Sequence, residues 1–86
     1  MKKIIGIRNN KGEYNGRSYE NFTVFFQIES KENSVGTIVE THKVKPNVMA
    51  AYIQQQKLPD YRAAIGRNVE LYFDQYKNVS VIQPAQ

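Results

Sequence analysis

The segment of residues 17–29 limits the possible folds more than any other part of the sequence. Apolar residues occupy every second position in its second half: Phe22, Val24, Phe26 and Ile28. Successive side chains of a β-strand point to opposite faces of the sheet, so this alternation predicts a long strand with one buried face. Tyr19 and Phe25 fall on the opposite face. The chain must therefore fold around a sheet, and its other elements must cover one side of that sheet.

Turn-forming residues divide the rest of the chain into further short elements. A run of isoleucines predicts a strand over residues 3–9, and the polar residues after it predict a loop that ends in a tight turn at Asn15-Gly16. Asn and Gly favour such turns because they accept the positive φ angles that a two-residue hairpin turn requires. The remaining expected strands are 35–44, 68–74 and 79–82, with a hairpin turn at 75–78 and Pro84 ending the last strand.

The hydrophobic period changes after residue 45. Residues 48–56 carry apolar side chains three and four positions apart, which predicts a helix, and Pro46-Asn47 is typical of a helix start. A shorter helical turn is predicted to begin at Asp60, as its cap, and to end at Gly66. The expected order is thus strand, strand, strand, helix, strand, strand.

This order is that of the OB-fold, a five-stranded, partly open barrel. We therefore predict a mainly β protein, a five-stranded OB-fold-like barrel with a helix between strands 3 and 4. A chain of 86 residues fits one domain, residues 1–86. The alternative is an open α+β sheet with the helix on one face. The residues assigned to the core are Phe22, Val24, Phe26, Val69, Leu71 and Phe73.

Catalytic chemistry finds little support in the sequence. There is no cysteine, and His42 is the only histidine, expected as a solvated strand residue, so no metal site and no cofactor are predicted. The acidic residues are scattered, without a spaced pair that suggests general acid and base. We predict that the protein is not an enzyme. No stretch approaches the ~20 apolar residues of a membrane span, so we expect no membrane partner, and we read the chain as complete and cytoplasmic.

Binding of a polyanion has better support. The formal net charge is +4, and the excess gathers in the first nineteen residues, where Glu13 is the only acid. Basic groups attract nucleic acid by releasing its counterions, and aromatic rings hold single strands by stacking on bases. An OB-fold binds such strands on strands 2 and 3, between the loops that follow strands 1 and 4. The candidate nucleic-acid-binding residues at these places are Lys11, Tyr14, Arg17, Tyr19, Phe25, Tyr76 and Lys77.

These residues divide into two roles. Lys11 and Arg17 are assigned to phosphates, and the aromatic residues are assigned to base stacking. Several have a structural alternative: Tyr14 and Tyr19 as cross-strand pairs that stabilise a hairpin, and Phe25 as a cap on an open barrel end or part of a dimer interface. For Tyr76, at a hairpin tip with little core to join, function is favoured. The expected ligand is single-stranded DNA; RNA binding and a protein-interaction module with the aromatics as its interface are the alternatives.

Two segments also resemble a known family. Gly16-Arg17-Ser18-Tyr19 leads into a long aromatic strand, and a late hairpin from Gly66 to Ile82 has an aromatic residue at its tip. In these features the chain is similar to the small phage-type single-stranded DNA-binding proteins, the family of the filamentous-phage gene V protein. The resemblance implies an OB-fold, DNA contacts by Arg17, Tyr19 and Tyr76, a homodimer that binds strands cooperatively, and a setting in phage or plasmid DNA replication.

Overall fold

The computed structural model describes residues 2–28 and 35–85, which form a mainly β structure with one α-helix. Its elements are β1 (Lys2–Tyr14), β2 (Arg17–Ile28), β3 (Ile38–Val44), α1 (Pro46–Gln56), the 3₁₀ helix η1 (Tyr61–Ala64), β4 (Asn68–Phe73) and β5 (Val79–Pro84). The predicted order of elements, with the helix between the third and fourth strands, is confirmed. Asp60 caps η1, as predicted, by accepting a hydrogen bond from the backbone N–H of Arg62 at 2.8 Å.

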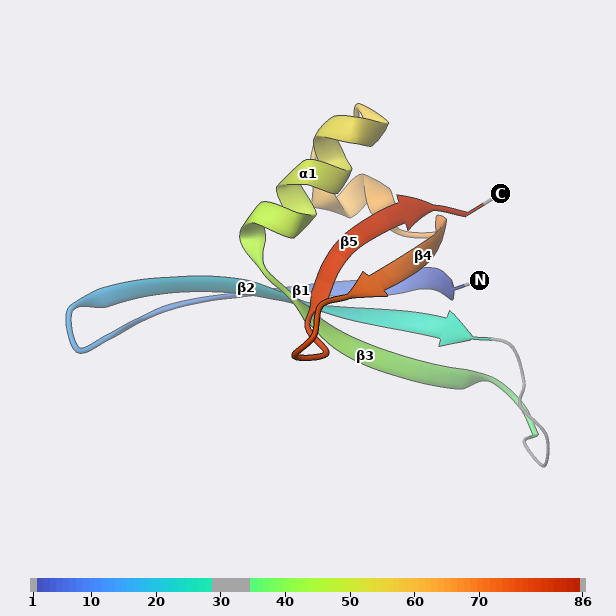
Figure 1. Ribbon diagram of the computed structural model, residues 1–86, viewed down its shortest axis with the longest axis horizontal. Coiled ribbons are helices and arrows are strands. Elements are labelled where there is room, and N and C mark those ends of the chain that lie inside the picture. The colour runs from blue at the N-terminus through green and yellow to red at the C-terminus, as the bar shows by residue number, and fades with distance from the viewer. Residues whose placement is uncertain (1, 29–34, 86) are drawn as a thin grey trace.

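The five strands form one antiparallel sheet in the order β3-β2-β1-β4-β5. β3 and β5 are its edges, and no backbone ladder joins them in the described part of the chain. The sheet bends strongly, so that β5 crosses in front of the other strands and approaches β3, while α1 lies above them (Figure 1). The described sheet is therefore five-stranded and antiparallel, with its two edge strands close together but not hydrogen-bonded.

The largest difference from expectation lies between residues 9 and 14. This segment was predicted to be a loop, but it continues β1 as far as Tyr14, and the third strand begins at Ile38 and not at residue 35. The extended β1 pairs with β2 up to the Asn15-Gly16 turn, whose φ angles are 51° and 75°. Polar residues can form this part of the strand because both faces of the two-stranded ribbon are in contact with water, so neither face needs apolar side chains. We call residues 9–21 the arm; it projects from the body of the molecule (Figure 1).

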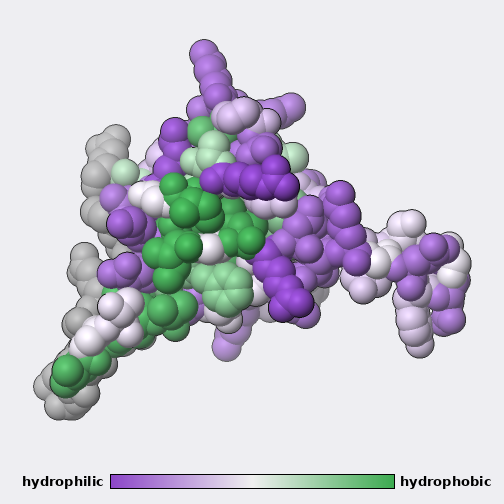
Figure 2. Space-filling model, turned by 180° about the vertical axis from the view of Figure 1, so that it is seen from behind, coloured by the Kyte–Doolittle hydropathy of each residue, from purple (hydrophilic) through white to green (hydrophobic). Residues whose placement is uncertain are grey.

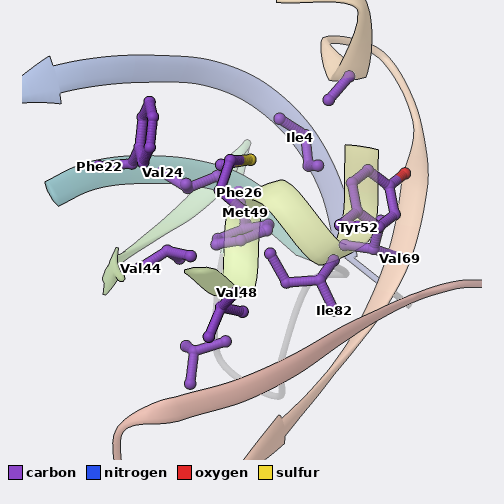
Figure 3. Packing of buried hydrophobic residues seen from close by; sticks show 12 residues of the cluster. Ile4, Phe22, Val24, Phe26, Val44, Val48, Met49, Tyr52, Val69 and Ile82 are labelled. Atoms are coloured by element: carbon purple, nitrogen blue, oxygen red, sulfur yellow. The ribbon is translucent and has the colours of Figure 1, made fainter. Parts of the chain in front are cut away.

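The core lies between the inner face of the sheet and one side of α1. Val48, Met49 and Tyr52 are the buried residues of the helix. Around them Figure 3 shows side chains from several strands pointing into one cluster. Within residues 2–28 and 35–85, the buried residues of the core are Ile4, Phe22, Val24, Phe26, Val44, Val48, Met49, Tyr52, Ala64, Val69, Val79 and Ile82. Four residues predicted for the core are thus confirmed in it, and Leu71 packs half-buried against it.

Phe73 was predicted to be in the core, and this is wrong: its side chain is 44% exposed. The register of β4 against β5 shifts between Tyr72 and Phe73. The extra residue at this shift is Ser80 of β5, and Phe73 itself is the last residue of β4, at the rim of the core. The Phe73 ring instead lies 5.3 Å from the ring of His42.

A small polar network closes the edge of the core at β3. Lys2 Nζ donates to Glu40 Oε2 at 2.6 Å, and His42 Nε2 lies 3.2 Å from the same oxygen. His42 is half-buried between the rings of Phe26 and Phe73, so its expected position as a solvated residue was wrong. The hydrogen bond from Lys2 is the main cause that lowers the pKa of Glu40 below its ordinary value of 4.5, and burial opposes it.

The lowered pKa of Glu40 predicts an acid-dependent loss of stability. A carboxylate whose pKa is depressed by folding stabilises the native state at neutral pH, and this contribution disappears as the pH falls through the folded-state pKa. Glu40→Gln should therefore lower the free energy of unfolding at pH 7, and this effect should shrink as the pH falls below the ordinary pKa of 4.5. Urea unfolding at pH 7 and at a series of lower pH values measures this change. Lys2→Met removes the main cause and should reduce the pH-dependent part; an equal effect of Glu40→Gln at all pH values would contradict the assignment.

Candidate nucleic-acid interface

The register of β1, β2 and β3 decides which side chains share a face. Cross-strand partners lie on the same side of a sheet, and positions two apart along a strand do so as well. In one row Arg8 is opposite Thr23, which is opposite Lys43; in the next, Gly6 is opposite Phe25, which is opposite Thr41. These rows lie on the side away from Phe22, Val24 and Phe26. We call this side of β1–β3 the outer face.

Charges of opposite sign are separated between the two sides of these strands. The register places Lys3, Arg8, Arg17 and Lys43 on the outer face. Among the described residues of β1, β2 and β3 the outer face carries no carboxylate, because Glu13, Glu20 and Glu40 all belong to the other side. None of the four cations forms an ion pair within the described part of the chain. The outer face is consequently a one-sign surface that attracts anions.

Lys11 differs from the other predicted phosphate ligand, Arg17. It is opposite Glu20 in the ladder, and its Nζ lies 3.3 Å from the Glu20 carboxylate. Both residues are on the side of the arm away from the outer face. The structure therefore brings Arg17 together with Tyr14 and Tyr19, and places Lys11 behind them with its charge partly balanced.

Two of the predicted aromatic residues lie opposite glycines. Tyr19 is paired with Gly12 on the arm, and Phe25 is paired with Gly6 on the body. Tyr14 is opposite Arg17 at the end of the arm, so Tyr14 and Tyr19 are not cross-strand partners of each other. Tyr14, Tyr19 and Phe25 share the outer face, and the two tyrosines are exposed. Between the arm and the body, Asn10 Nδ2 donates to Asn21 Oδ1 and Thr23 Oγ1, both at 2.9 Å, which ties the two strands together on this face.

The β4–β5 hairpin presents the remaining predicted residues, Tyr76 and Lys77. Asp74 Oδ1 accepts hydrogen bonds from the backbone N–H groups of Tyr76 at 2.8 Å and Asn78 at 3.0 Å. Lys77 adopts the left-handed conformation, with φ of 64°. The turn is thus fixed by its own side chain, and it holds Tyr76 in solvent with 74% of the side chain exposed.

A cleft joins the hairpin to the β2–β3 strands. It measures about 220 Å³, and its lining residues are Asn21, Lys43, Val44, Lys45, Asn78 and Val79. Two ammonium groups and two amides therefore border one small cleft, in which no lining residue is acidic. Figure 1 shows the β4–β5 turn lying near the point where the arm leaves the body. The cleft thus lies between Asn21 and Lys43 on the strands and Asn78 at the end of the hairpin turn.

The site predicted from the sequence did not include Arg8, Asn21, Lys43, Lys45 or Asn78. The signal for Arg8 was present in the chain. A two-residue turn at Asn15-Gly16 fixes Tyr14 opposite Arg17, and counting back along both strands places Arg8 beside Thr23. Asn78 reaches the site only because β5 approaches β3 in three dimensions, and no local sequence pattern predicts that approach.

The back of the molecule also carries apolar residues. Figure 2 shows a continuous apolar area on the back of the molecule, bordered by hydrophilic residues. Exposed apolar side chains on β1 and β3 include Ile5 and Val39. Ile5 stands at the register shift between Ile4 and Gly6, where an extra residue turns its side chain out of the regular alternation.

Within residues 2–28 and 35–85, no three His, Asp or Glu side chains gather where they could hold a metal ion. None of the helices described for this chain is long and apolar enough to span a membrane. Comparisons of the chain with protein-family models, with curated proteins and with solved structures found no match.

Proposed function

We propose that this protein binds single-stranded DNA on its outer face, without catalytic chemistry of its own. The observation that carries the proposal is the separation of charge: the outer face combines Arg8, Arg17 and Lys43 with Tyr19 and Phe25, and it holds no carboxylate among the described residues of β1–β3. Cations without acidic neighbours neutralise phosphates, and aromatic rings between them stack on unpaired bases.

The strand order supports a partly open OB-fold-like barrel as the frame of this site. β1 is the strand that pairs with both β2 and β4, the helix follows β3, and β5 approaches β3 without a ladder. In OB-folds the strand 2–3 surface and the loop between strands 4 and 5 take part in ligand binding. In this chain the corresponding parts are the outer face and the Asp74–Asn78 turn.

The cleft between these parts suggests a path for the strand. A single strand that stacks on Tyr19 would pass Asn21 and enter the cleft bordered by Lys43 and Lys45. It would leave the cleft beside the hairpin, where Tyr76 and Lys77 stand exposed. The polar side chains along this route offer both phosphate neutralisation and hydrogen bonds to base edges.

The direct test is a titration of labelled oligo-dT of about 30 nucleotides, followed by fluorescence anisotropy at low and high salt. A length of this size exceeds the ~4–16 nucleotides that one OB-fold occupies. We expect binding that weakens steeply with salt and prefers the single strand over its duplex. Competition with a matched RNA shows whether the sugar is distinguished. The absence of binding at low salt would reject the proposal.

A second candidate follows from the shape of the arm. A two-stranded β-ribbon can enter the major groove of duplex DNA, and the arm is such a ribbon, with Arg17 at its end. Preference for duplex in the titration would support this candidate. Base stacking on Tyr19 would then have no role.

The resemblance described above implies a homodimer. Sedimentation of the free protein and of its complex with oligo-dT tests this part separately from binding.

Tyr76 provides a prediction for the hairpin tip. Tyr76→Ala should weaken binding of oligo-dT by about 1–3 kcal/mol if the ring stacks on a base. Tyr72→Ala is the matched control, because Tyr72 is also exposed but lies on β4 between Glu70 and Asp74. Anisotropy titrations of both variants measure the effect, with unfolding curves to show that each remains folded. If Tyr76→Ala bound oligo-dT as tightly as Tyr72→Ala, the hairpin tip would not be part of the site.

A further inference from the structure

Gly12 and Tyr19 are in unusually close contact on the outer face of the arm. They are direct partners in the β1–β2 ladder. A Cβ atom added to Gly12 would overlap the hydroxyl oxygen and Cζ of Tyr19, and it would lie only 2.6 Å from Cε1. The end of the tyrosine ring thus occupies the space that a side chain at position 12 would need. Only glycine allows the ring to lie there.

The exposures of the tyrosines agree with this arrangement. Tyr14 and Tyr76 stand nearly free, with 73% and 74% of their side chains exposed. Tyr19 is 52% exposed, although it lies on the same narrow arm as Tyr14. The difference arises because the ring of Tyr19 lies across the neighbouring strand and does not project into solvent.

We propose that Gly12 is a positioning residue for base stacking: it forms the cradle that holds the ring of Tyr19 against β1 with its outward surface ready for a base. This inference rests on the proposed function. A ring that is already fixed loses less conformational freedom on binding, so the same stacking contact gives more affinity. Glycine opposite an aromatic residue is a known way to accommodate a ring on a sheet.

A second glycine provides a matched comparison. Gly6 is opposite Phe25, but a Cβ atom at Gly6 would lie 3.4 Å from Phe25 Cδ2, a distance that side chains tolerate. Neither Gly6 nor Gly12 has a φ in the left-handed region, so alanine fits the backbone at both positions. Gly6→Ala should therefore leave its aromatic partner in place, whereas Gly12→Ala must displace Tyr19.

The test is a double-mutant cycle with oligo-dT of about 30 nucleotides. Tyr19→Ala should weaken binding by about 5- to 150-fold. Gly12→Ala keeps the ring but no longer holds it in place, so it should weaken binding by about 2- to 13-fold. The double variant should bind no more weakly than Tyr19→Ala alone. The salt dependence should be unchanged in all three, because no cation is removed. Gly6→Ala leaves its aromatic partner in place, so it should weaken binding clearly less than Gly12→Ala does.

Three outcomes would overturn the proposal. Parental affinity of Gly12→Ala would show that the cradle is not needed, and additive losses in the double variant would show that Gly12 acts without Tyr19. A reduced salt dependence of Gly12→Ala would mean that the whole arm, with Arg17, had been disturbed. In each of these cases the parent protein still binds, and the proposed function stands.

A measurement without ligand separates the two proposals further. In the free protein, the ring of Tyr19 should shift the Hα resonances of Gly12 upfield in the NMR spectrum, and Tyr19→Leu should remove that shift. Absence of the shift in the parent protein would refute the cradle, whatever the binding data show. Presence of the shift together with no binding of oligo-dT would reject the nucleic-acid function and, with it, a role of Gly12 in stacking.

Discussion

Phe26→Ala is expected to lower the free energy of unfolding by about 3–5 kcal/mol, the usual cost of emptying a buried phenylalanine site. Phe26 is fully buried in the centre of the cluster between the sheet and α1. Domains have net stabilities of only about 5–15 kcal/mol, so this loss is a large fraction of the total free energy of unfolding. Urea unfolding followed by circular dichroism measures the change.

Phe25→Ala is the control for this experiment. It removes the same ring from the adjacent residue of the same strand, but Phe25 is only partly buried, on the outer face. We expect a clearly smaller loss, because part of the ring is already in water and no closed cavity is created. Equal losses for the two variants would contradict the assignment of inner and outer faces.

The second large effect concerns the cations of the outer face. Each phosphate contact to a single strand contributes about 0.7 to the slope of log K against log salt. Arg17→Ala with Lys43→Ala should therefore reduce that slope by about 1.4 and weaken binding to oligo-dT by roughly 25-fold at 0.1 M salt. Titrations at several salt concentrations determine both values.

Lys11→Ala with Arg62→Ala is the matched control, since it removes the same number of charges from the protein. Lys11 lies behind the outer face at 3.3 Å from Glu20, and Arg62 lies 3.7 Å from Asp60 on η1. This pair should change the affinity and the slope little. A similar loss in both double variants would show that only net charge matters, and the outer face would lose its special role.

The sequence predicted those parts of the fold that depend on local pattern. The alternation of residues 22–28 identified the central strand and its buried face, and Pro46 together with the apolar spacing after it identified α1. The polar half of β1 was missed because its strand is stabilised by pairing with β2 and not by an apolar face of its own. Phe73 was misplaced because alternation does not show where a strand leaves the core, and Phe73 is the last residue of β4.

The candidate site was predictable in part for the same reason. Tyr19 and Phe25 were placed correctly on one face, since both lie on the strand with the clearest pattern. Lys11 was grouped with Arg17 by distance along the chain, although the pairing across the hairpin puts the two on opposite sides. The cleft was beyond sequence reasoning, because it requires the bend of the sheet that brings Asn78 to Lys43.

The register shift between Ile4 and Gly6 separates β1 into two segments, residues 2–4 and 6–14. The burial of Ile4 fixes the first segment, and the packing of Ile7 against the core together with the Asn15-Gly16 turn fixes the second. The extra residue absorbs the mismatch between them. The reach of the arm can therefore change without rebuilding the body, provided that both strands grow or shrink by two residues at a time. With arms of different lengths, the same body would present the same order of faces to single-stranded ligands of different length.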